Sequence, residues 1–200
     1  MAQPTEQERE NDLPSREVLI ALGSNLPSDI GSPVAAVRSA AAALAARHAS
    51  ARLSPLYRTP AFPPGSGPDY VNAAMTLRSA RPAADLLADL HAIEAEAGRT
   101  RSLRWGARVL DLDLLACGDE VLPDAATFVR WRDLPLARQQ VDSPDRLILP
   151  HPRMQDRGFV LRPLADLSPD WRHPVIGATV AGMLAALPPD ALEGVVPLPG

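Results

Sequence analysis

Cysteine is nearly absent from this sequence: Cys117 is the single one among 200 residues, so the chain cannot close an internal disulfide. Cys117 follows an apolar stretch, and we expect a small buried hydrophobic residue there rather than a reactive thiol. A chain without disulfides fits a reduced, cytoplasmic compartment, which is the localisation that we expect.

Long hydrophobic runs are missing as well. No apolar stretch reaches the about 20 residues that a transmembrane helix needs. The polar N-terminus lacks the apolar core of a signal peptide. The sequence therefore predicts no membrane partner, and it predicts a disordered tail over residues 1–16.

An excess of basic charge is also lacking, since the net charge is −4 and the isoelectric point is about 5.5. This balance argues against a general nucleic-acid binder, although it is compatible with a local basic pocket. The hydrophobic content of 46% is enough for one sizeable core. We therefore expect residues 17–200 to form a single domain, with an irregular insertion at about 119–146.

Hydrophobic periodicity predicts an α+β fold. Strands are predicted at 18–22, 50–57, 70–77, 109–115 and 147–149, and helices at 33–47, 82–97, 159–167 and from Thr179 to Leu187. The order βαββαβ with trailing C-terminal helices is typical of a ferredoxin-like core, in which helices cover one face of a largely antiparallel sheet.

Two aspartates one residue apart, Asp111 and Asp113, lie within an aliphatic strand and therefore point to the same face. Neighbouring carboxylates repel each other unless a cation compensates, and Mg²⁺ favours one or two carboxylates completed by water and phosphate oxygens. Arginines, whose forked guanidinium groups suit phosphate, lie nearby at positions 99, 101, 104, 108 and 157. Such a pair is often only the wet face of a sheet, but with these arginines it favours phosphoryl-transfer chemistry.

A second group of residues is suited to a flat ring. Asn72 lies in an otherwise apolar strand, and a buried amide needs hydrogen-bond partners. Its amide can also read the donor and acceptor edge of a heterocycle. Together with a tyrosine and Phe159, Asn72 could clamp a planar ring beside a polyphosphate held by arginines and metal.

Five segments carry a resemblance to a known family. They are ALGSNL at 21–26, YRTP at 57–60, PDYVNAA at 68–74, RWGARVLDLDLL at 104–115 and LPHPRMQDRGFVLRPL at 149–164. In this order they resemble the hydroxymethyldihydropterin pyrophosphokinases of folate biosynthesis, from residue 18 to about 187. The resemblance implies a monomeric enzyme that transfers pyrophosphate from ATP to the hydroxymethyl group of a dihydropterin and releases AMP.

The resemblance also implies roles for individual residues. Asp111 and Asp113 would hold two Mg²⁺ ions that bridge the ATP phosphates, and Arg99 and Arg108 would be catalytic residues near the phosphates. The remaining nucleotide-binding residues would be Glu94, Arg101, Arg104, Trp105, Arg146, His151 and Arg157, of which Arg101, Arg104 and Trp105 lie in a loop that closes over the substrates. The pterin ring would lie between Phe62 and Phe159, in a pocket lined by Thr59, Pro60, Tyr70 and Asn72.

Several alternatives stay open at this point. A metal-dependent nucleotidyltransferase would need a third carboxylate, and no acid in the chain is clearly placed for it. An RNA-binding module would need aromatic and basic residues on its central strands. A family member that binds pterin without turnover is a further alternative. The insertion has two interpretations: it covers the nucleotide site, or it contacts another protein.

Overall fold

The computed structural model of the chain describes residues 14–48, 50–61, 65, 67–98, 108–139 and 141–199. Its strands are β1 (Arg16–Ser24), β2 (Arg52–Leu53), β3 (Tyr57–Thr59), β4 (Tyr70–Ser79), β5 (Asp111–Cys117) and β6 (Val196–Pro197). Its α-helices are α2 (Pro33–Arg47), α3 (Ala83–Glu96), α4 (Ala125–Arg132), α5 (Leu136–Gln139), α6 (Gly158–Ala165) and α7 (Val180–Ala186). Short 3-10 helices cover Met154–Asp156 and Pro189–Leu192.

The sheet confirms the predicted ferredoxin-like α+β fold. Its strands lie in the order β5-β1-β4-β3-β6, and β2 pairs with β4. Each of these pairings is antiparallel. The long central strands β1 and β4 pair along their whole length, so the middle of the sheet is its most regular part.

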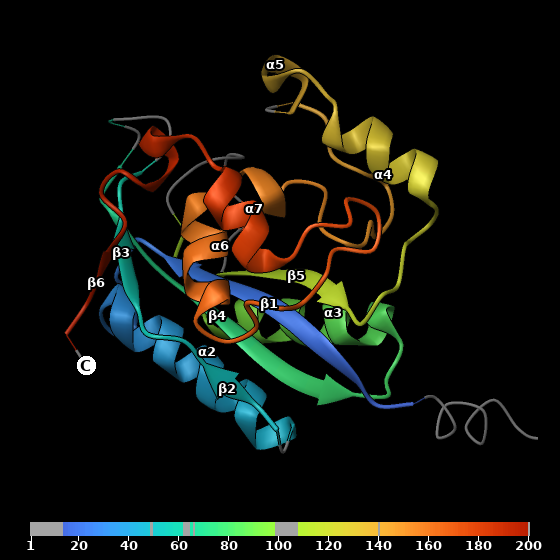
Figure 1. The fold of residues 1–200 in the computed structure, drawn as a ribbon. Coiled ribbons are helices and arrows are strands. Elements are labelled where there is room, and N and C mark those ends of the chain that lie inside the picture. Colours follow the sequence, from blue (N-terminus) through green and yellow to red (C-terminus); the bar gives the residue numbers. More distant parts are fainter. Residues whose placement is uncertain are drawn as a thin grey trace, which may run out of the picture.

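Two layers of helices enclose the sheet (Figure 1). Alternate residues of β1 face opposite layers: Val18 and Ile20 pack with α2 and α3, whereas Leu19 packs with α6 and α7. The prediction of helices on one face holds for α2 and α3. The C-terminal helices cover the other face, because β1, β4 and β5 present apolar residues on both sides.

The helix ends follow from local sequence signals. The Ser32 side chain accepts a hydrogen bond from the Ala35 backbone N–H, and Pro33 occupies the first turn of α2, as its sequence predicts. Thr179 caps α7 in the same way. Gly98 follows α3 with φ of +82°, a conformation in which glycine commonly ends helices.

The structure corrects three predicted elements. The strand expected at 50–57 is two short strands, β2 and β3, because Ser54 and Pro55 interrupt it. The strand expected at 147–149 is a single bridge between Leu122 and Leu149. The insertion at 119–146, expected to be irregular, contains the two helices α4 and α5.

Helix α4 docks onto the domain through one aromatic cluster. Phe128 is fully buried, and its ring centroid lies 5.0 Å from that of His173, which in turn lies 5.8 Å from Trp171. His173 Nδ1 accepts hydrogen bonds from the backbone N–H groups of Val175 and Ile176. The insertion is therefore anchored in the same core as the C-terminal segment.

Two expectations can be compared with the structure: that Cys117 is buried, and that the chain has no membrane-spanning helix. Cys117 is fully buried, as predicted, and burial raises the pKa of its thiol to about 12. Within the described ranges, none of the helices is both long and apolar enough to cross a membrane. The predicted tail falls mostly on residues outside the described ranges, and β1 begins at Arg16.

The buried His173 predicts an acid-sensitive stability. Burial lowers the pKa of His173 from 6.5 to about 4, so the folded protein holds this proton less tightly than the unfolded chain does. The stabilisation from neutral His173 is complete above pH 6.5 and is lost as the pH falls toward 4. Urea unfolding across this range should show a steep loss of stability, and His173→Asn should make that slope shallower. Equal slopes for both proteins would contradict the assignment.

Candidate active site

The two aspartates of β5 share one face, as predicted. Asp111 and Asp113 are half-exposed, whereas Leu112 and Leu114 between and beyond them are buried in the core with α2 and α3. The Arg108 guanidinium pairs with Asp111. Arg157 Nη1 lies 3.7 Å from Asp113 Oδ2. Each carboxylate therefore has a cationic partner that reduces the repulsion between the two.

The turn after β1 holds the start of β5 in place. The Asn25 backbone N–H donates to the Arg108 carbonyl (3.0 Å), and Asn25 Oδ1 accepts from the Arg108 backbone N–H (2.7 Å). Ser24 Oγ donates to the Val109 carbonyl (2.5 Å). The sequence signal for this contact is the polar Ser-Asn pair that ends an apolar strand. Their role is to position Arg108 and, through it, Asp111.

A row of residues crosses the sheet from the aspartates. Gly23 pairs with Asp111 on one side and with Asn72 on the other, and Asn72 pairs with Tyr57. Directly paired residues on neighbouring strands point to the same face. An ideal Cβ on Gly23 would lie 2.8 Å from Asn72 Oδ1. The absence of a side chain at Gly23 therefore gives the Asn72 amide room to lie against β1, the strand next to Asp111.

The amide end of this row is polar and largely buried. Asn72 is 7% exposed, and its Nδ2 donates to Oγ1 of the buried Thr59 (2.7 Å). Tyr70, two residues before Asn72, is half-buried, and burial raises the pKa of its phenol above 10 while Arg108 opposes that rise. The predicted ring-binding residues Thr59, Tyr70 and Asn72 thus lie together, next to Asp111.

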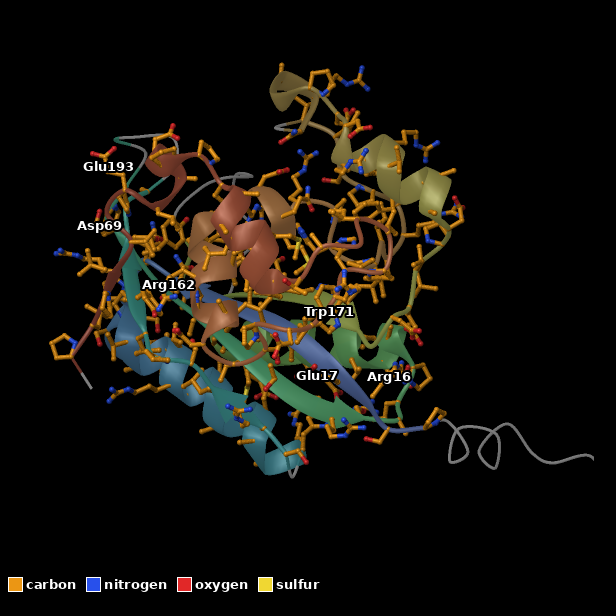
Figure 2. The ribbon with its side chains drawn as sticks, in the orientation of Figure 1. Arg16, Glu17, Asp69, Arg162, Trp171 and Glu193 are labelled. Atoms are coloured by element: carbon orange, nitrogen blue, oxygen red, sulfur yellow. The ribbon has the colours of Figure 1, made fainter. Side chains whose placement is uncertain are left out.

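The far end of the row is fastened to α6. The Tyr57 hydroxyl donates to Asp166 Oδ2 (2.6 Å), and Arg162 Nη2 donates to Asp166 Oδ1 (2.9 Å). The Arg162 guanidinium also lies 5.7 Å from the centre of the Tyr57 ring. Figure 2 shows Arg162 on the side of α6 that faces β3. These contacts fix α6 to β3, at the end of the sheet where ring binding is predicted.

Helix α6 begins with two of the predicted site residues close by. Phe159 is half-buried, and the Arg157 guanidinium lies 5.7 Å from the centre of its ring. His151 donates its backbone N–H to the Leu115 carbonyl of β5 (2.7 Å). Burial, with the positive charges of Arg157 and Arg153, lowers the pKa of His151 to about 3. His151 is therefore neutral near neutral pH.

The C-terminal segment supports the same end of the site. Residues Val196–Pro197 form β6 and pair with β3. An ideal Cβ on Gly158 would lie 2.1 Å from the Ala191 carbonyl oxygen, and one on Gly194 would lie 2.6 Å from Pro60 Cγ. Because of this close packing, Pro60 and the start of α6 both lie against the segment from Ala191 to Gly194.

Two predicted nucleotide-binding residues, Glu94 and Arg146, are engaged with other partners. Glu94 is 3% exposed, and its Oε1 accepts a hydrogen bond from the Leu112 backbone N–H (2.8 Å), on the open edge of β5. Arg146 is exposed, pairs with Asp145, and lines a cavity beside α4. The remaining predicted residues, Phe62, Arg99, Arg101, Arg104 and Trp105, lie outside the described residues.

The donor set on β5 fits Mg²⁺. The described residues contain no cluster of three or more His, Cys, Asp or Glu side chains that could hold a metal ion. Mg²⁺ needs no such cluster, because it is commonly held by one or two carboxylates, with water and substrate phosphates supplying the other oxygens. Asp111 and Asp113 are partly exposed on a rigid strand, which suits this mode of binding.

A ferredoxin-like sheet that carries two carboxylates and two guanidinium groups next to the polar side chains of Asn72 and Thr59 has the parts of a phosphoryl-transferring enzyme. The particular family is given by sequence. The 7,8-dihydro-6-hydroxymethylpterin-pyrophosphokinase (HPPK) family matches residues 19–169, and the chain belongs to this family.

Several relatives are similar over most of the chain. The chain is 41% identical over 188 residues to the 2-amino-4-hydroxy-6-hydroxymethyldihydropteridine pyrophosphokinase of Pseudomonas aeruginosa, covering 92% of this chain and 98% of that one. It is 37% identical to the Synechocystis protein of the same name, covering 90% and 80%. A triple mutant of Plasmodium falciparum HPPK-DHPS shares the fold, with a TM-score of 0.61 and 13% identity over 90% of this chain. The chain spans only 46% of that longer protein.

Gly23 provides a test of the site geometry. In Gly23→Ala the new Cβ would displace the Asn72 amide and weaken its bond to Thr59, so we expect the free energy of unfolding to fall by about 1–3 kcal/mol. Gly67→Ala is the matched control, because its Cβ would meet Asn25 Nδ2 at an ordinary 3.5 Å. The control should stay within about 0.5 kcal/mol of the wild type. Urea unfolding measures both, and equal stability of the two variants would contradict the geometry.

Proposed function

We propose that this protein transfers the pyrophosphoryl group of ATP to the hydroxymethyl group of 6-hydroxymethyl-7,8-dihydropterin, releasing AMP, in folate biosynthesis. The observation that carries the proposal is the row across the sheet, in which Gly23 separates Asp111 from Asn72. It sets the Asn72 amide one strand away from the strand that carries the two carboxylates, which suits a ring-binding pocket beside a metal site. Membership of the HPPK family supports the same reaction.

The pterin ring binds at the amide end of the row. The Asn72 amide and the Thr59 hydroxyl offer donors and acceptors to the ring edge, and they are oriented by their own hydrogen bond. Phe159 at the start of α6 supplies an apolar face against which a flat ring can pack. Tyr70, Pro60 and Phe62 complete the pocket in this proposal.

The polyphosphate binds at the carboxylate end. Asp111 and Asp113 would hold Mg²⁺, which when bound neutralises charge on the phosphate oxygens and acidifies a bound hydroxyl. Arg108 and Arg157 already lie against these carboxylates, where their forks can also reach phosphate. In the proposal the neutral His151 donates a hydrogen bond to phosphate, and Arg99, Arg101, Arg104, Trp105, Glu94 and Arg146 complete the nucleotide site.

The chain's own residues contribute mainly positioning and electrostatics. The pterin hydroxymethyl oxygen forms a bond to the β-phosphorus, while the bond from that phosphorus to the oxygen of the departing AMP breaks. Asn72 and Phe159 orient the attacking group, and the arginines stabilise negative charge that develops on the phosphoryl oxygens. None of the described residues is clearly placed as a dedicated general base.

The identity of the nucleotide product tests the proposed reaction. Purified protein incubated with ATP, Mg²⁺ and hydroxymethyldihydropterin should form AMP, and only when the pterin is present. Product analysis by chromatography distinguishes this from an ordinary kinase, which would form ADP. A folded protein that gives no pterin-dependent product would instead fit a family member that binds without turnover.

Asp113→Ala tests the metal assignment. The variant should lose turnover by about three orders of magnitude or more, about 4 kcal/mol in the transition state, because one of the two oxygen donors for Mg²⁺ is gone. Its fold should persist, since Asp113 is half-exposed. Asp142→Ala removes a carboxylate that pairs with Arg138 on the surface, and it should keep full activity. Near-normal turnover in Asp113→Ala would remove the assignment.

A further inference from the structure

One side of α6 carries three residues that connect this helix to β3. Phe159, Arg162 and Asp166 follow one another at intervals of three and four residues, so they lie along one side of α6 and its C-terminal cap. The Tyr57 hydroxyl of β3 donates to Asp166 Oδ2 (2.6 Å), and Arg162 Nη2 donates to Asp166 Oδ1 (2.9 Å). The aromatic residue that is proposed to pack on the pterin thus shares a side of the helix with the residues that bind β3.

The contact between Tyr57 and Asp166 is sheltered from solvent. Tyr57 is 3% exposed, and the side chain of Asp166 is 21% exposed. Burial, followed by the hydrogen bond to Asp166, raises the pKa of the Tyr57 phenol above 10, so the hydroxyl remains a donor at neutral pH. Hydrogen bonds to a carboxylate are stronger than those between neutral groups, and they are directional. The contact can therefore fix the orientation of α6 relative to β3.

Helix α6 has few internal means of holding its own orientation. It spans only Gly158–Ala165, its N-cap residue Arg157 forms no side-chain capping bond, and Pro163 lies within it. Because proline has no N–H, the usual helical bond to the carbonyl of Phe159, four residues earlier, cannot form. A helix this short depends on tertiary contacts rather than on its own stability.

Two contacts at opposite ends define the direction of α6. At its start, Gly158 packs so closely on the Ala191 carbonyl oxygen that an ideal Cβ would lie 2.1 Å from it. At its end, Asp166 accepts the Tyr57 hydroxyl. The buried apolar residues of α6 also pack on the sheet, but apolar contacts are not directional. The direction in which Phe159 points therefore depends on both end contacts.

The strand that binds Asp166 also binds the amide that is proposed to read the ring. Tyr57 pairs directly with Asn72 of β4, and Thr59, two residues further along β3, accepts the hydrogen bond from Asn72 Nδ2 (2.7 Å). Directly paired residues point to the same face of a sheet, and here α6 covers that face. Tyr57 therefore connects the two sides of the proposed ring site, Phe159 and Asn72.

We propose that Tyr57 and Asp166 are positioning residues that set the distance and angle between Phe159 and the Asn72 amide, and thereby the affinity for the pterin ring. The inference rests on the proposed function and deepens it, because it adds two residues that act without touching the substrate. Without their hydrogen bond, only a fraction of the molecules would present Phe159 correctly, and the affinity for pterin would fall by that fraction.

Pterin binding measured apart from turnover tests the inference. Tyr57→Phe removes only the hydroxyl. In calorimetric titration with Mg²⁺ and a non-hydrolysable α,β-methylene analogue of ATP present, hydroxymethyldihydropterin should bind Tyr57→Phe about tenfold more weakly than wild type. Affinity for the ATP analogue alone should be unchanged. In steady-state assays the KM for pterin should rise about tenfold, while kcat and the KM for ATP stay within about twofold of wild type.

Ser168→Ala is the matched control. Ser168 Oγ donates to Glu17 Oε1 (2.5 Å), which joins the segment after α6 to β1, and Figure 2 shows Glu17 well apart from Arg162. The control removes a hydroxyl–carboxylate bond of the same kind, so it should lose a similar amount of stability in urea and keep wild-type affinity for pterin. Unchanged pterin affinity in Tyr57→Phe, or an equal loss in Ser168→Ala, would overturn the inference.

Coupling between the two positions gives a second readout. Asp166→Ala should weaken pterin binding about as much as Tyr57→Phe, and the double variant should lose no more than either single variant, because all three lack the same bond. Additive losses would overturn the inference. Wild-type protein that binds pterin but forms no AMP would contradict the proposed reaction alone, since the variants' affinities still decide the positioning role. Wild-type protein that binds no pterin would overturn both.

Discussion

The centre of the candidate site depends on Gly23 of β1, a position without a side chain. Gly23 stands opposite Asp111 on one neighbouring strand and opposite Asn72 on the other, and a side chain at this position would collide with the Asn72 amide. In the proposed function, the ring-binding and phosphate-binding groups lie on strands separated by Gly23, which presents backbone alone. The other residues of the candidate site lie on the strands to either side of Gly23 and on the segments that pack against them.

The strand that carries the aspartates is an edge strand, and an unprotected edge is prone to pair with other chains. Here its outer hydrogen-bonding groups are used within the domain: Glu94 accepts from the Leu112 N–H, and His151 donates to the Leu115 carbonyl. Asn25 holds the start of the strand by two hydrogen bonds to Arg108. The same contacts that close the edge also immobilise the backbone on which Asp111 and Asp113 are spaced.

The features that could be predicted from the sequence are those determined by residues close together in the chain. Two-residue alternation is enough to place Asp111 and Asp113 on one face of β5, and Ser32 followed by Pro33 is enough to start α2. The buried amide of Asn72 was expected to need a partner, and Thr59 provides it. The element order was also sufficient for the ferredoxin-like arrangement, because few topologies accommodate βαββαβ around one core.

The parts that sequence did not predict depend on residues far apart in the chain. The register that sets Gly23 between Asp111 and Asn72 is a property of three strands together, and no local pattern encodes it. Helix α4 was missed because its sequence is largely polar. Phe128 is its one buried residue, and it packs on His173, 45 positions later. The prediction of one strand at 50–57 was wrong for a similar reason. Ser54 forms hydrogen bonds with the backbone of Ala74 at the point where regular β pairing would otherwise continue. Long-range partners therefore decide where the site lies on the fold, while local chemistry decides which residues can serve in it.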